Sequence, residues 1–384
     1  MKQAAHAPTK AAQYWPALAE QMTVDWDGLA TRLPFARDMR ACIQDATYHA
    51  EGDVWSHTRM VVEDLQRRRP DLPIPPDRWA GLFLATLLHD IAKPATRSVD
   101  VDVDGRPRVH HYGHSRIGAL MAWEFLWREG IPRPIREQVF HLVRWHQRPF
   151  HLTFSPTLQR DAIIFSQVGD WRELLALATA DNFGRIAPNR AETAATLDLL
   201  GQEIAQLGCL DRPWPFGSDA ARVWFGRLED RSAYFDPQPP SGSHVIVLSG
   251  LPGAGKDTYC RTAFADWPQV SLDQWRDRLD IAPDAAQGRV IQAAMEEARE
   301  HLRAKRRFIW NATNVSRLNR DKAVGLCLDY DALVEIHAFD PSSDRLLAQN
   351  RSRADKVPQA VIDRLLMKWE PPSLLEAHRV VWIE

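Results

Sequence analysis

The sequence has few cysteines, no long apolar run and almost no net charge, and each of these absences excludes a class of protein. The four cysteines among 384 residues are scattered, which argues against a disulfide framework or a cysteine zinc site and favours free thiols in a reducing cytoplasm. No run of about 18 apolar residues occurs, and the start of the chain, MKQAAHAPTK, lacks the apolar core of a signal peptide. We therefore expect a cytoplasmic protein with no membrane partner.

The charges balance, with 48 lysines and arginines against 50 acidic residues and a formal net charge of −2. No global basic field therefore indicates a nucleic acid, and any polyanion site must be local. A length of 384 residues is more than one core usually supports, so two domains are expected.

The two parts of the chain differ in their apolar period. From Tyr14 to about Asp230, apolar residues recur at three- and four-residue spacing, which predicts an all-α domain. Its helices are expected near residues 35–44, 53–69, 77–91, 114–129, 133–146, 158–181 and 190–207. The linker DPQPPSGS, residues 236–243, ends this part, because proline, glycine and serine together suit neither helix nor strand. The expected domains are therefore residues 1–240 and 241–384.

After the linker, short strand-like segments alternate with helical ones, which is typical of an α/β domain with a parallel sheet. The predicted strands are His244–Ser249, Gln269–Asp273, Phe308–Asn314, Leu333–Phe339 and Val380–Ile383. The predicted architecture is therefore an all-α domain followed by an α/β domain.

A glycine-rich turn follows the first predicted strand, in HVIVLSGLPGAGKDT. Strand, glycine-rich turn and helix start are the context of a phosphate-binding loop for ATP or another NTP. Glycines let backbone N–H groups face phosphate oxygens, the next helix offers its positive end, and Lys256 reaches the β and γ phosphates. The predicted nucleotide-binding residues here are Gly250, Gly253, Ala254, Gly255, Lys256, Asp257 and Thr258.

Asp257 departs from the usual pattern, because serine or threonine normally follows the lysine and binds magnesium. A carboxylate beside a triphosphate is unfavourable unless a cation lies between them, so Asp257 is expected to hold Mg²⁺ directly or through water. Thr258 is expected to face the α or β phosphate. Asn311, which ends the third strand, cannot act as a base and is expected to orient a water molecule or a loop.

Two further segments supply candidates for phosphoryl transfer. Asp273 lies at the carboxyl end of the second strand, where ligands bind in parallel sheets, and can accept the proton of an attacking hydroxyl. Arg276, three residues later, can hold an anion on the same acceptor, and a surface ion pair between the two is the alternative. The later segment Gln349–Pro358 is basic, as a lid over the transferring phosphoryl group requires, or it is a solvated loop.

These motifs resemble those of the phage-type polynucleotide 5′-kinases, which have a phosphate-binding loop, Asp-x-x-Arg after the second strand and an arginine lid followed by Val-Pro. The resemblance implies that Asp273 is the general base, Arg276 contacts the phosphate 3′ of the acceptor nucleotide, and Arg353 is the lid arginine. The family's lid often carries arginines four apart, but Gln349 stands at the first of these places. Either Arg351 substitutes for it or that contact is absent.

The all-α part contains an adjacent His89 and Asp90 at the end of an apolar helical run, LFLATLLHDIAKP. Such a pair reaches one ion only at a frayed or kinked helix end, and Pro94 disfavours helical geometry at Lys93. Asp90 has two oxygens and can therefore bridge two ions. Taken alone, the pair is more often a capped core pair than a metal site.

Four more residues on amphipathic segments can join this pair, and each would be costly to bury without a partner. Metal ligation accounts for the full set, which is His57, His89, Asp90, His114, His146 and Asp181. One ion would be held by His57, His89, Asp90 and Asp181, and a second by Asp90, His114 and His146. Two such ions can activate water and hold a phosphate. These nitrogen and oxygen ligands admit one or two divalent transition metals without selecting among Mn, Fe, Co, Ni, Cu and Zn.

The order of these ligands, with LLHDIAKP, GHSRIGA and ADNFGR around them, resembles the HD phosphohydrolase superfamily. The resemblance implies that Lys93, one turn beyond the pair, contacts phosphate. His141 lies about 140° round the helix from His146, so both cannot face one metal. His146 is the predicted ligand, with His141 in the core or behind the ligands. His110 and His111, in the loop before His114, can line the site.

The whole chain, from TYHAEGDVWSHT to its last strand, resembles the bacterial HD-domain polynucleotide kinases. The resemblance implies that the first domain removes a 2′,3′-cyclic phosphate, 2′-phosphate or 3′-phosphate from RNA or DNA ends. It also implies that the second domain phosphorylates a 5′-OH end with an NTP and Mg²⁺, after which a ligase seals the healed ends.

Two alternatives remain open. One is an HD nucleotide hydrolase joined to a kinase of a nucleoside or small molecule, and the other is a module that senses a nucleotide without turnover. Arg276 argues against the first, because a small neutral acceptor offers it no anion. The complete ligand set argues against the second, because a sensor does not need both metals.

Overall fold

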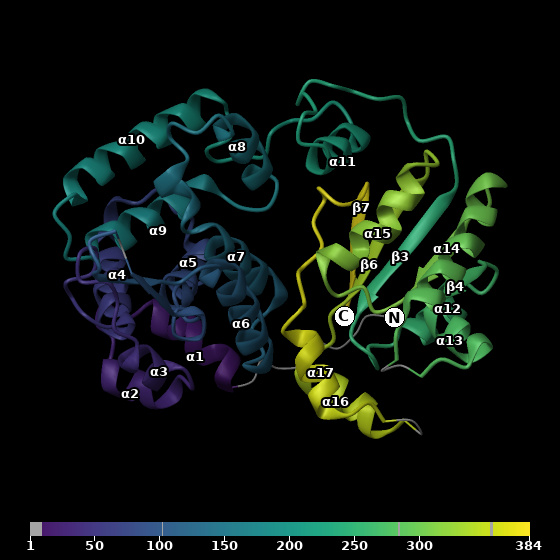
Figure 1. The fold of residues 1–384 in the computed structure, drawn as a ribbon, viewed down its shortest axis with the longest axis horizontal. Helices are drawn as coiled ribbons and strands as arrows, with labels where there is room; N and C mark the ends of the chain where they lie inside the picture. Colours follow the sequence, from purple (N-terminus) through teal and green to yellow (C-terminus); the bar gives the residue numbers. More distant parts are fainter. Residues whose placement is uncertain (1–9, 102, 283–284, 354–355) are drawn as a thin grey trace. The chain divides into compact units, whose positions relative to one another are not determined.

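The computed structural model describes residues 10–101, 103–282, 285–353 and 356–384 (Figure 1). The chain divides into two compact units, Met1–Trp214 and Pro215–Glu384. Each unit has its own buried core. In the described residues, no helix is long and apolar enough to cross a membrane.

The division between the units lies earlier than residue 240, where the sequence placed it, because helix α11 (Asp219–Arg227) packs within the second unit. Val223 of α11 is fully buried in the core of that unit. Arg222 donates hydrogen bonds to the backbone carbonyl oxygens of Leu374 and His378. The proline-rich segment therefore follows the first helix of the second unit instead of separating the units.

The first unit is built from helices around a buried central one. Its helices are α1 (Lys10–Ala19), α2 (Trp26–Arg32), α3 (Ala36–Ala41), α4 (Val54–Arg68), α5 (Pro76–Leu88), α6 (His114–Arg128), α7 (Arg133–Trp145), α8 (Leu158–Ser166), α9 (Trp171–Phe183) and α10 (Arg190–Gln206). Short 3₁₀ turns are η1 (Arg69–Asp71), η2 (Pro94–Thr96) and η3 (Arg148–His151). Helix α5 is buried along most of its length and packs against α1, α4, α7 and α9.

One predicted helix, residues 158–181, is two helices in the structure, α8 and α9. The chain turns at Gly169, where a Cβ atom would lie 2.5 Å from the ring of Phe165. Asp170 then caps α9, because its carboxylate accepts a hydrogen bond of 2.9 Å from the backbone nitrogen of Arg172. The period of the apolar residues continues across this break, which is why the sequence indicates one helix.

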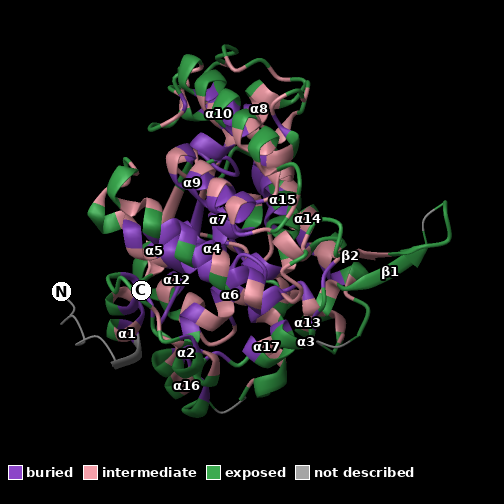
Figure 2. Ribbon diagram, turned by 90° about the vertical axis from the view of Figure 1, so that its left-hand side faces the viewer, coloured by how far each residue is buried: buried purple, intermediate pink, exposed green. Residues whose placement is uncertain are grey.

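The helical unit also contains an antiparallel hairpin that the sequence did not predict. Its strands are β1 (Ser98–Val101) and β2 (Pro107–His110). Figure 2 shows β1 as exposed along its length. Val99, Asp100 and Val101 alternate as in a strand, but the segment is short and exposed on both faces, so it does not stand out as a half-buried strand.

The second unit is a parallel sheet covered by helices. Its strands are β3 (His244–Gly250), β4 (Gln269–Ser271), β5 (Phe308–Asn311), β6 (Leu333–Phe339) and β7 (Arg379–Ile383), in the order β4-β5-β3-β6-β7. Its further helices are α12 (Lys256–Ala263), α13 (Leu272–Leu279), α14 (Gly288–Arg303), α15 (Arg317–Leu328), α16 (Ser343–Arg351) and α17 (Gln359–Leu366). All strand pairs are parallel, as the alternating pattern predicted.

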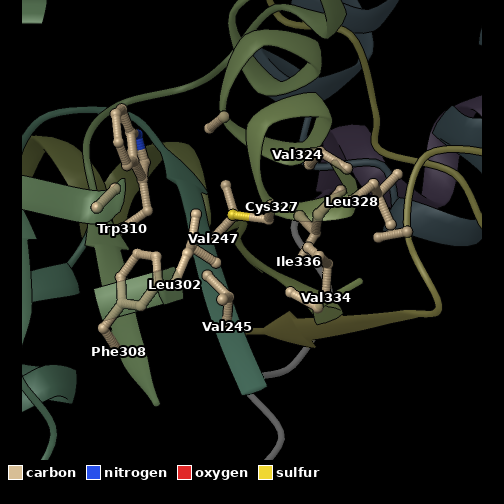
Figure 3. Close-up of a cluster of buried hydrophobic side chains, with 14 of the residues drawn as sticks. Val245, Val247, Leu302, Phe308, Trp310, Val324, Cys327, Leu328, Val334 and Ile336 are labelled. Atoms are coloured by element: carbon tan, nitrogen blue, oxygen red, sulfur yellow. The ribbon is translucent and has the colours of Figure 1, made fainter. Parts of the chain in front are cut away.

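One cluster of buried apolar side chains in the second unit lies on one face of the sheet (Figure 3). Val245 and Val247 of β3 lie between the aromatic side chains Phe308 and Trp310 of β5 and the aliphatic side chains of β6. Residues of α14 and α15, such as Leu302, cover this face. Each fully buried side chain of this size contributes roughly 1.5–3 kcal/mol to folding.

A fully buried arginine fixes the end of the second unit. Nε and Nη2 of Arg320 donate to the two carboxylate oxygens of Glu376 at 2.7 and 3.0 Å. Its Nη1 donates to the backbone carbonyl oxygens of Asn314, Val315 and Glu370. The chain before β7 is thereby joined to the loop that follows β5.

Arg320→Ala is expected to lower the free energy of unfolding of the second unit by about 3–5 kcal/mol, because it leaves Glu376 charged and buried without its partner. Calorimetry of the full chain measures the loss. Arg299→Ala is the control, because its pairing with Glu296 is partly exposed and contributes under about 1 kcal/mol. Equal effects of the two substitutions would contradict the stabilising role of the buried Arg320–Glu376 pair.

Candidate metal centre and phosphate site

Helix ends and faces converge in the first unit and bring the six predicted metal ligands together. The ligands come from α4 (His57), the turn after α5 (His89 and Asp90), the start of α6 (His114), the turn after α7 (His146) and α9 (Asp181). Both carboxylates and three of the imidazoles are buried. Because α5 ends at Leu88, the adjacent histidine and aspartate lie in a turn, where both can face one point.

Asp90 lies between two groups of imidazoles and presents a different oxygen to each. Its Oδ2 atom is 3.1 Å from Nε2 of His89 and 3.6 Å from Nε2 of His57. Its Oδ1 atom is 3.5 Å from Nε2 of His114 and 3.6 Å from Nε2 of His146. One carboxylate is therefore placed to serve two cations.

The imidazole rings are oriented by their other nitrogen. In three of them Nδ1 forms a hydrogen bond to the backbone carbonyl oxygen three residues earlier, which are the pairs His89–Thr86 at 2.8 Å, His114–His111 at 2.7 Å and His146–Val143 at 2.8 Å. The Nδ1 atom of His57 lies 3.0 Å from Oε1 of Glu51. An acceptor at Nδ1 keeps the proton there and leaves the Nε2 lone pair for a cation.

Burial and charge act in opposite directions on the titratable groups. Burial alone would lower the pKa of His57, but Asp181, whose Oδ1 lies 3.2 Å from Nε2 of His57, and Glu51 raise it to about 9. Burial alone would raise the pKa of Asp181, but His57 holds it far below its usual range. The pKa of Asp90 is also held well below its usual range, against burial, by His89. The carboxylates therefore stay ionised, which is the state that binds a cation.

The donor set fits divalent cations. Among the described residues, Nε2 of His57, Nε2 of His89 and both oxygens of Asp90 are buried and make no hydrogen bond of good geometry. Two groups, His57–His89–Asp90 and Asp90–His114–His146, each have ligand atoms within 4.8 Å of one another. Nitrogen and oxygen donors in this arrangement suit first-row transition ions.

Lys93, expected to contact phosphate, has its ammonium group at the same centre. Its Nζ atom is 2.7 Å from Oδ2 of Asp90 and donates a 2.7 Å hydrogen bond to Oε1 of Gln44. The side chain is buried. Lys93 therefore brings a positively charged group of the chain itself to the centre.

In the second unit, the loop between β3 and α12 borders a pocket of about 330 Å³. Gly253 and Gly255 have φ angles of 81° and 98°, in the left-handed region that glycine adopts without strain. Gly250 has a different role, because a Cβ atom there would lie 2.8 Å from Cβ of Phe339 on β6. The pocket is lined by Gly253, Gly255, Lys256, Asp257, Thr258, Arg261, Gln349 and Arg353. Gly250 and Ala254 shape the loop without lining the pocket.

Lys256 begins α12 with its side chain turned back over the loop. Its Nζ atom donates hydrogen bonds of 2.9 Å to the carbonyl oxygens of Gly250 and of the next residue. Burial lowers the pKa of Lys256 to about 8, an effect that Asp257 and Asp273 oppose and Arg353 increases. The predicted base and the predicted lid arginine are therefore both within electrostatic reach of the phosphate-binding lysine.

Asp257 lines the pocket with one carboxylate oxygen held by the sheet. Nδ2 of Asn311, at the end of β5, donates a 2.9 Å hydrogen bond to Oδ1 of Asp257. Asn311 therefore orients this carboxylate and leaves Oδ2 for a cation. Thr258, which also lines the pocket, accepts a 3.2 Å hydrogen bond at Oγ1 from Nη2 of Arg261.

Asp273 and Arg276 lie one turn apart on α13 and form an ion pair. Asp273 is exposed, whereas Arg276 is partly buried and its Nε also donates to Oε1 of Gln287 at 2.7 Å. The structure thus shows the ion pair that the spacing allowed, and the catalytic roles of both residues stay predictions.

Gln349, and not Arg351, faces the pocket from α16. With its amide oriented to suit its neighbours, Gln349 donates to the carbonyl oxygen of Gly253 at 2.8 Å and accepts from Nε of Arg345 at 3.3 Å. Arg353 also lines the pocket, whereas Arg351 is exposed and outside its lining. Arg351 therefore does not take the first lid position in this structure, because it lies about 200° round the helix from Gln349. Residues 354 and 355 of the predicted lid lie outside the described part of the chain.

Two family models match separate parts of the chain. Residues 54–195 match the HD domain, and residues 245–372 match the AAA domain. The first match covers the buried His and Asp centre, and the second covers the phosphate-binding loop. An HD domain precedes a P-loop domain.

Several curated proteins are similar to parts of this chain. The A-adding tRNA nucleotidyltransferase of Deinococcus radiodurans is 30% identical over 183 residues, which are 47% of this chain and 38% of that protein. The multifunctional CCA protein of Dechloromonas aromatica is 29% identical over 52% of this chain and 48% of its own length. The bifunctional uridylyltransferase/uridylyl-removing enzyme of Bradyrhizobium diazoefficiens is 27% identical over 56% of this chain and 18% of its own length. The chain thus spans less than half the length of these relatives.

Three residues at the HD centre are not marked by the sequence pattern. Gln44 and Glu51 lie in the irregular loop before α4, where no period or motif singles out a side chain. Arg185 lies one turn after Asp181, in the ADNFGR segment, and its charge contributes to the low pKa of that aspartate. Each of the three contacts a predicted residue or shifts its pKa, so these residues are found only from the spatial neighbours of the predicted ones.

His146→Asn is expected to weaken transition-metal binding by at least about tenfold, because it removes an Nε2 donor on the Oδ1 side of Asp90. His141→Asn is the matched control, since the ring of His141 packs edge-on against Phe140. Elemental analysis after dialysis against a metal buffer measures the bound metal. Metal loss in His141→Asn with retention in His146→Asn would reverse the assignment.

Proposed function

We propose that the protein is a bifunctional enzyme that heals broken RNA or DNA ends. The HD domain removes a 2′,3′-cyclic phosphate, 2′-phosphate or 3′-phosphate, and the P-loop domain transfers the γ-phosphate of ATP or another NTP to a 5′-OH end. One observation carries the proposal, which is that both kinds of site occur in a single chain. The first unit has two groups of metal-ligand atoms that share the buried carboxylate of Asp90. The second unit has a pocket lined by the phosphate-binding loop, with the candidate base Asp273 near it. A downstream ligase, acting in the cytoplasm, would receive both ends ready to seal.

In the HD domain, divalent transition ions would be held by His57, His89, Asp90 and Asp181 on one side and by Asp90, His114 and His146 on the other. Bound ions supply Lewis acidity and lower the pKa of water. The carbonyl oxygens at Nδ1 keep the imidazoles in the tautomer that donates a lone pair. Lys93 adds a positive charge beside Asp90 that stabilises the phosphate being released.

In the P-loop domain, the loop and Lys256 would hold the phosphates of the NTP, and Asp257 would hold Mg²⁺ directly or through water. Asp273 accepts the proton of the attacking 5′-OH while the O5′–phosphorus bond forms and the bond to the leaving nucleoside diphosphate breaks. Arg353 stabilises the charge on the transferred group. Its place in the lining of the pocket supports this role.

Arg276 links acceptor binding to the base. It pairs with Asp273 in the structure, and the phosphate 3′ of the acceptor nucleotide competes for the same guanidinium. An acceptor that carries this phosphate therefore draws Arg276 away and leaves the Asp273 carboxylate to take the proton. The similarity to a protein named for tRNA supports a nucleic-acid acceptor.

A second candidate function is an HD nucleotide hydrolase joined to a kinase of a small hydroxyl compound. The similarity to an enzyme named for removing a uridylyl group favours it. An end-labelled oligonucleotide with 5′-OH and 2′,3′-cyclic phosphate ends, incubated with ATP, Mg²⁺ and a divalent transition metal, decides between the two. Healing of both ends supports the first proposal, and two unchanged ends support the second.

Lys256→Ala is expected to reduce phosphorylation at least about a hundredfold while phosphate release continues, because the lysine charge acts only on the NTP. Asp90→Ala is expected to do the reverse, because it removes the carboxylate shared by both donor groups. Product ends are resolved on denaturing gels for both variants. If either substitution abolished both activities in a folded protein, the assignment of one reaction to each domain would be wrong.

A 3′-phosphorylated nucleoside is expected to be the smallest kinase acceptor, because it alone gives Arg276 an anion. Arg276→Ala is expected to raise the KM for this acceptor about 10- to 100-fold, the usual effect of losing a charged hydrogen bond. Arg276→Lys, which keeps the charge, is the control and is expected to lose less. Equal phosphorylation of an unphosphorylated nucleoside by the wild type would refute the role of Arg276.

A further inference from the structure

Glu51 connects two of the elements that carry metal ligands. Its side chain is 2% exposed, and its Oε1 atom lies 3.0 Å from Nδ1 of His57 on α4. Its other oxygen, Oε2, accepts a 2.9 Å hydrogen bond from the backbone nitrogen of Ile186, in the loop that follows α9 and Asp181. One buried carboxylate therefore joins the helix of His57 to the chain that leaves the helix of Asp181.

The backbone around Glu51 is held on both sides. Before it, the backbone nitrogen of Ala50 donates to the carbonyl oxygen of Ile186 at 3.2 Å. After it, Asp53 caps α4, because its Oδ1 atom accepts a 2.8 Å hydrogen bond from the backbone nitrogen of Ser56. The carboxylate of Glu51 is therefore presented to the metal centre from a loop that is fixed at both ends.

His57 differs from the other three ligand imidazoles in the group behind it. The Nδ1 atoms of those three bond to neutral backbone carbonyl oxygens, whereas Nδ1 of His57 faces the charged carboxylate of Glu51. The contact is bent, so its short distance and the charge carry the effect more than a straight hydrogen bond does. A carboxylate behind an imidazole makes the other ring nitrogen a stronger metal donor. Nε2 of His57 is therefore the imidazole nitrogen of the centre that a carboxylate of this kind strengthens.

The two sides of Asp90 also differ in their other ligands. On the Oδ2 side, Oδ1 of Asp181 lies 3.2 Å from Nε2 of His57, so a cation there meets a second carboxylate. On the Oδ1 side, the candidate ligand group among the described residues consists of Asp90 and two imidazoles. Lys93 opposes a cation from 2.7 Å away from Oδ2, but its charge acts on imidazoles of both sides. The Oδ2 side therefore offers a cation two carboxylates and the strengthened imidazole.

We infer that Glu51 is a positioning residue that makes the His57 side of Asp90 the tighter of the two cation sites. With one oxygen it strengthens the donor atom of His57, and with the other it holds the loop behind Asp181. This role goes beyond the proposed function, since it concerns ion binding, whichever phosphoester the centre acts on. The first divalent ion would bind on the His57 side, and the second would bind on the side of His146 at a higher concentration.

A separate ion beside Glu51 would require the wrong nitrogen of His57. His49, Glu51 and His57 do have candidate ligand atoms within 4.8 Å of one another, and Nδ1 of His49 lies 2.7 Å from Oε1 of Glu51. A neutral imidazole has one lone pair, so His57 can serve an ion at Nδ1 or at Nε2 but not at both. Asp90 and Asp181 lie at its Nε2, which leaves the proton of Nδ1 facing Glu51.

Calorimetric titration of the metal-free full chain with Co²⁺, in the absence of substrate, measures this effect. In a His146→Asn background, which leaves the His57 side intact, Glu51→Gln is expected to raise the Kd of the remaining ion at least about tenfold, the usual result of losing a group behind a ligand. In a His57→Asn background, Glu51→Gln is expected to change the Kd by less than about twofold, because the remaining ion lies on the other side of Asp90.

Glu63→Gln is the matched control, because Glu63 is an exposed carboxylate on the same helix α4 and accepts a hydrogen bond from Nε1 of Trp26. It is expected to leave the Kd unchanged in both backgrounds. Equal losses with Glu51→Gln in the two backgrounds would show a general structural role and overturn the inference. An unchanged Kd in the His146→Asn background would overturn it as well.

Metal content separates a positioning residue from a metal ligand. His49→Asn is expected to bind as many Co²⁺ ions per chain as the wild type, measured by elemental analysis at saturating metal. Loss of one ion per chain would show that His49 and Glu51 bind a metal themselves, which overturns the positioning role. Neither measurement uses a phosphoester, so an HD domain that released no phosphate from any strand end would refute the proposed reaction and leave the role of Glu51 standing.

Discussion

A carboxylate buried among imidazoles is the constraint on which the first unit depends. Burying the charge of Asp90 is expensive unless partners compensate for it, and the partners come from α4, α5, α6 and α7. Two helices end just where a ligand is needed, at Leu88 and at Trp145, so that their terminal carbonyl groups have no partner within the helix. The histidine that follows each helix donates its Nδ1 proton to one of these carbonyl groups. One hydrogen bond thus completes the helix end and orients the ligand.

The second unit has to bind a negatively charged triphosphate in a pocket that itself contains a carboxylate. The loop after β3 offers backbone nitrogens, Lys256 and the start of a helix, yet it also carries the carboxylate of Asp257. Asn311 holds one oxygen of that carboxylate, so its negative charge points in a fixed direction. Arg353 and Arg261 add positive charge around the same pocket. The arrangement suits a triphosphate that arrives with a cation better than one that arrives alone.

The sequence predicted the architecture well, because both domains have strong periodic signals. The parallel sheet, the phosphate-binding loop and the HD domain were all expected and are present. The features that it missed have physical reasons. The exposed hairpin β1–β2 has no buried face, and the break at Gly169 does not interrupt the apolar period. The helical period of α11 does not tell which of the two units the helix packs in.

The predicted site residues differ in how far sequence alone can place them. The six His and Asp ligands converge because each lies on a helix or in the turn that directly follows one. Arg351 does not reach the phosphate pocket, since its direction depends on the phase of α16, which the sequence did not fix. Gln44 and Glu51 come from an irregular loop whose path is set by tertiary contacts, such as the bond from Gln44 to Lys93. The motifs therefore predicted the metal-ligand and phosphate-binding residues, whereas the residues that contact and orient them were found only in the three-dimensional structure.

The shared use of Asp90 makes the two donor groups thermodynamically dependent on each other. A cation on the His57 side withdraws charge from Oδ2, so the Oδ1 atom offers less to a cation on the His146 side. By linkage, the second cation weakens the first by the same factor. If two cations bind at this centre, a low metal concentration would therefore fill one side and a higher concentration would be needed to fill both. The number of bound ions would then depend on the concentration of free metal in the cell as well as on the affinity of the protein.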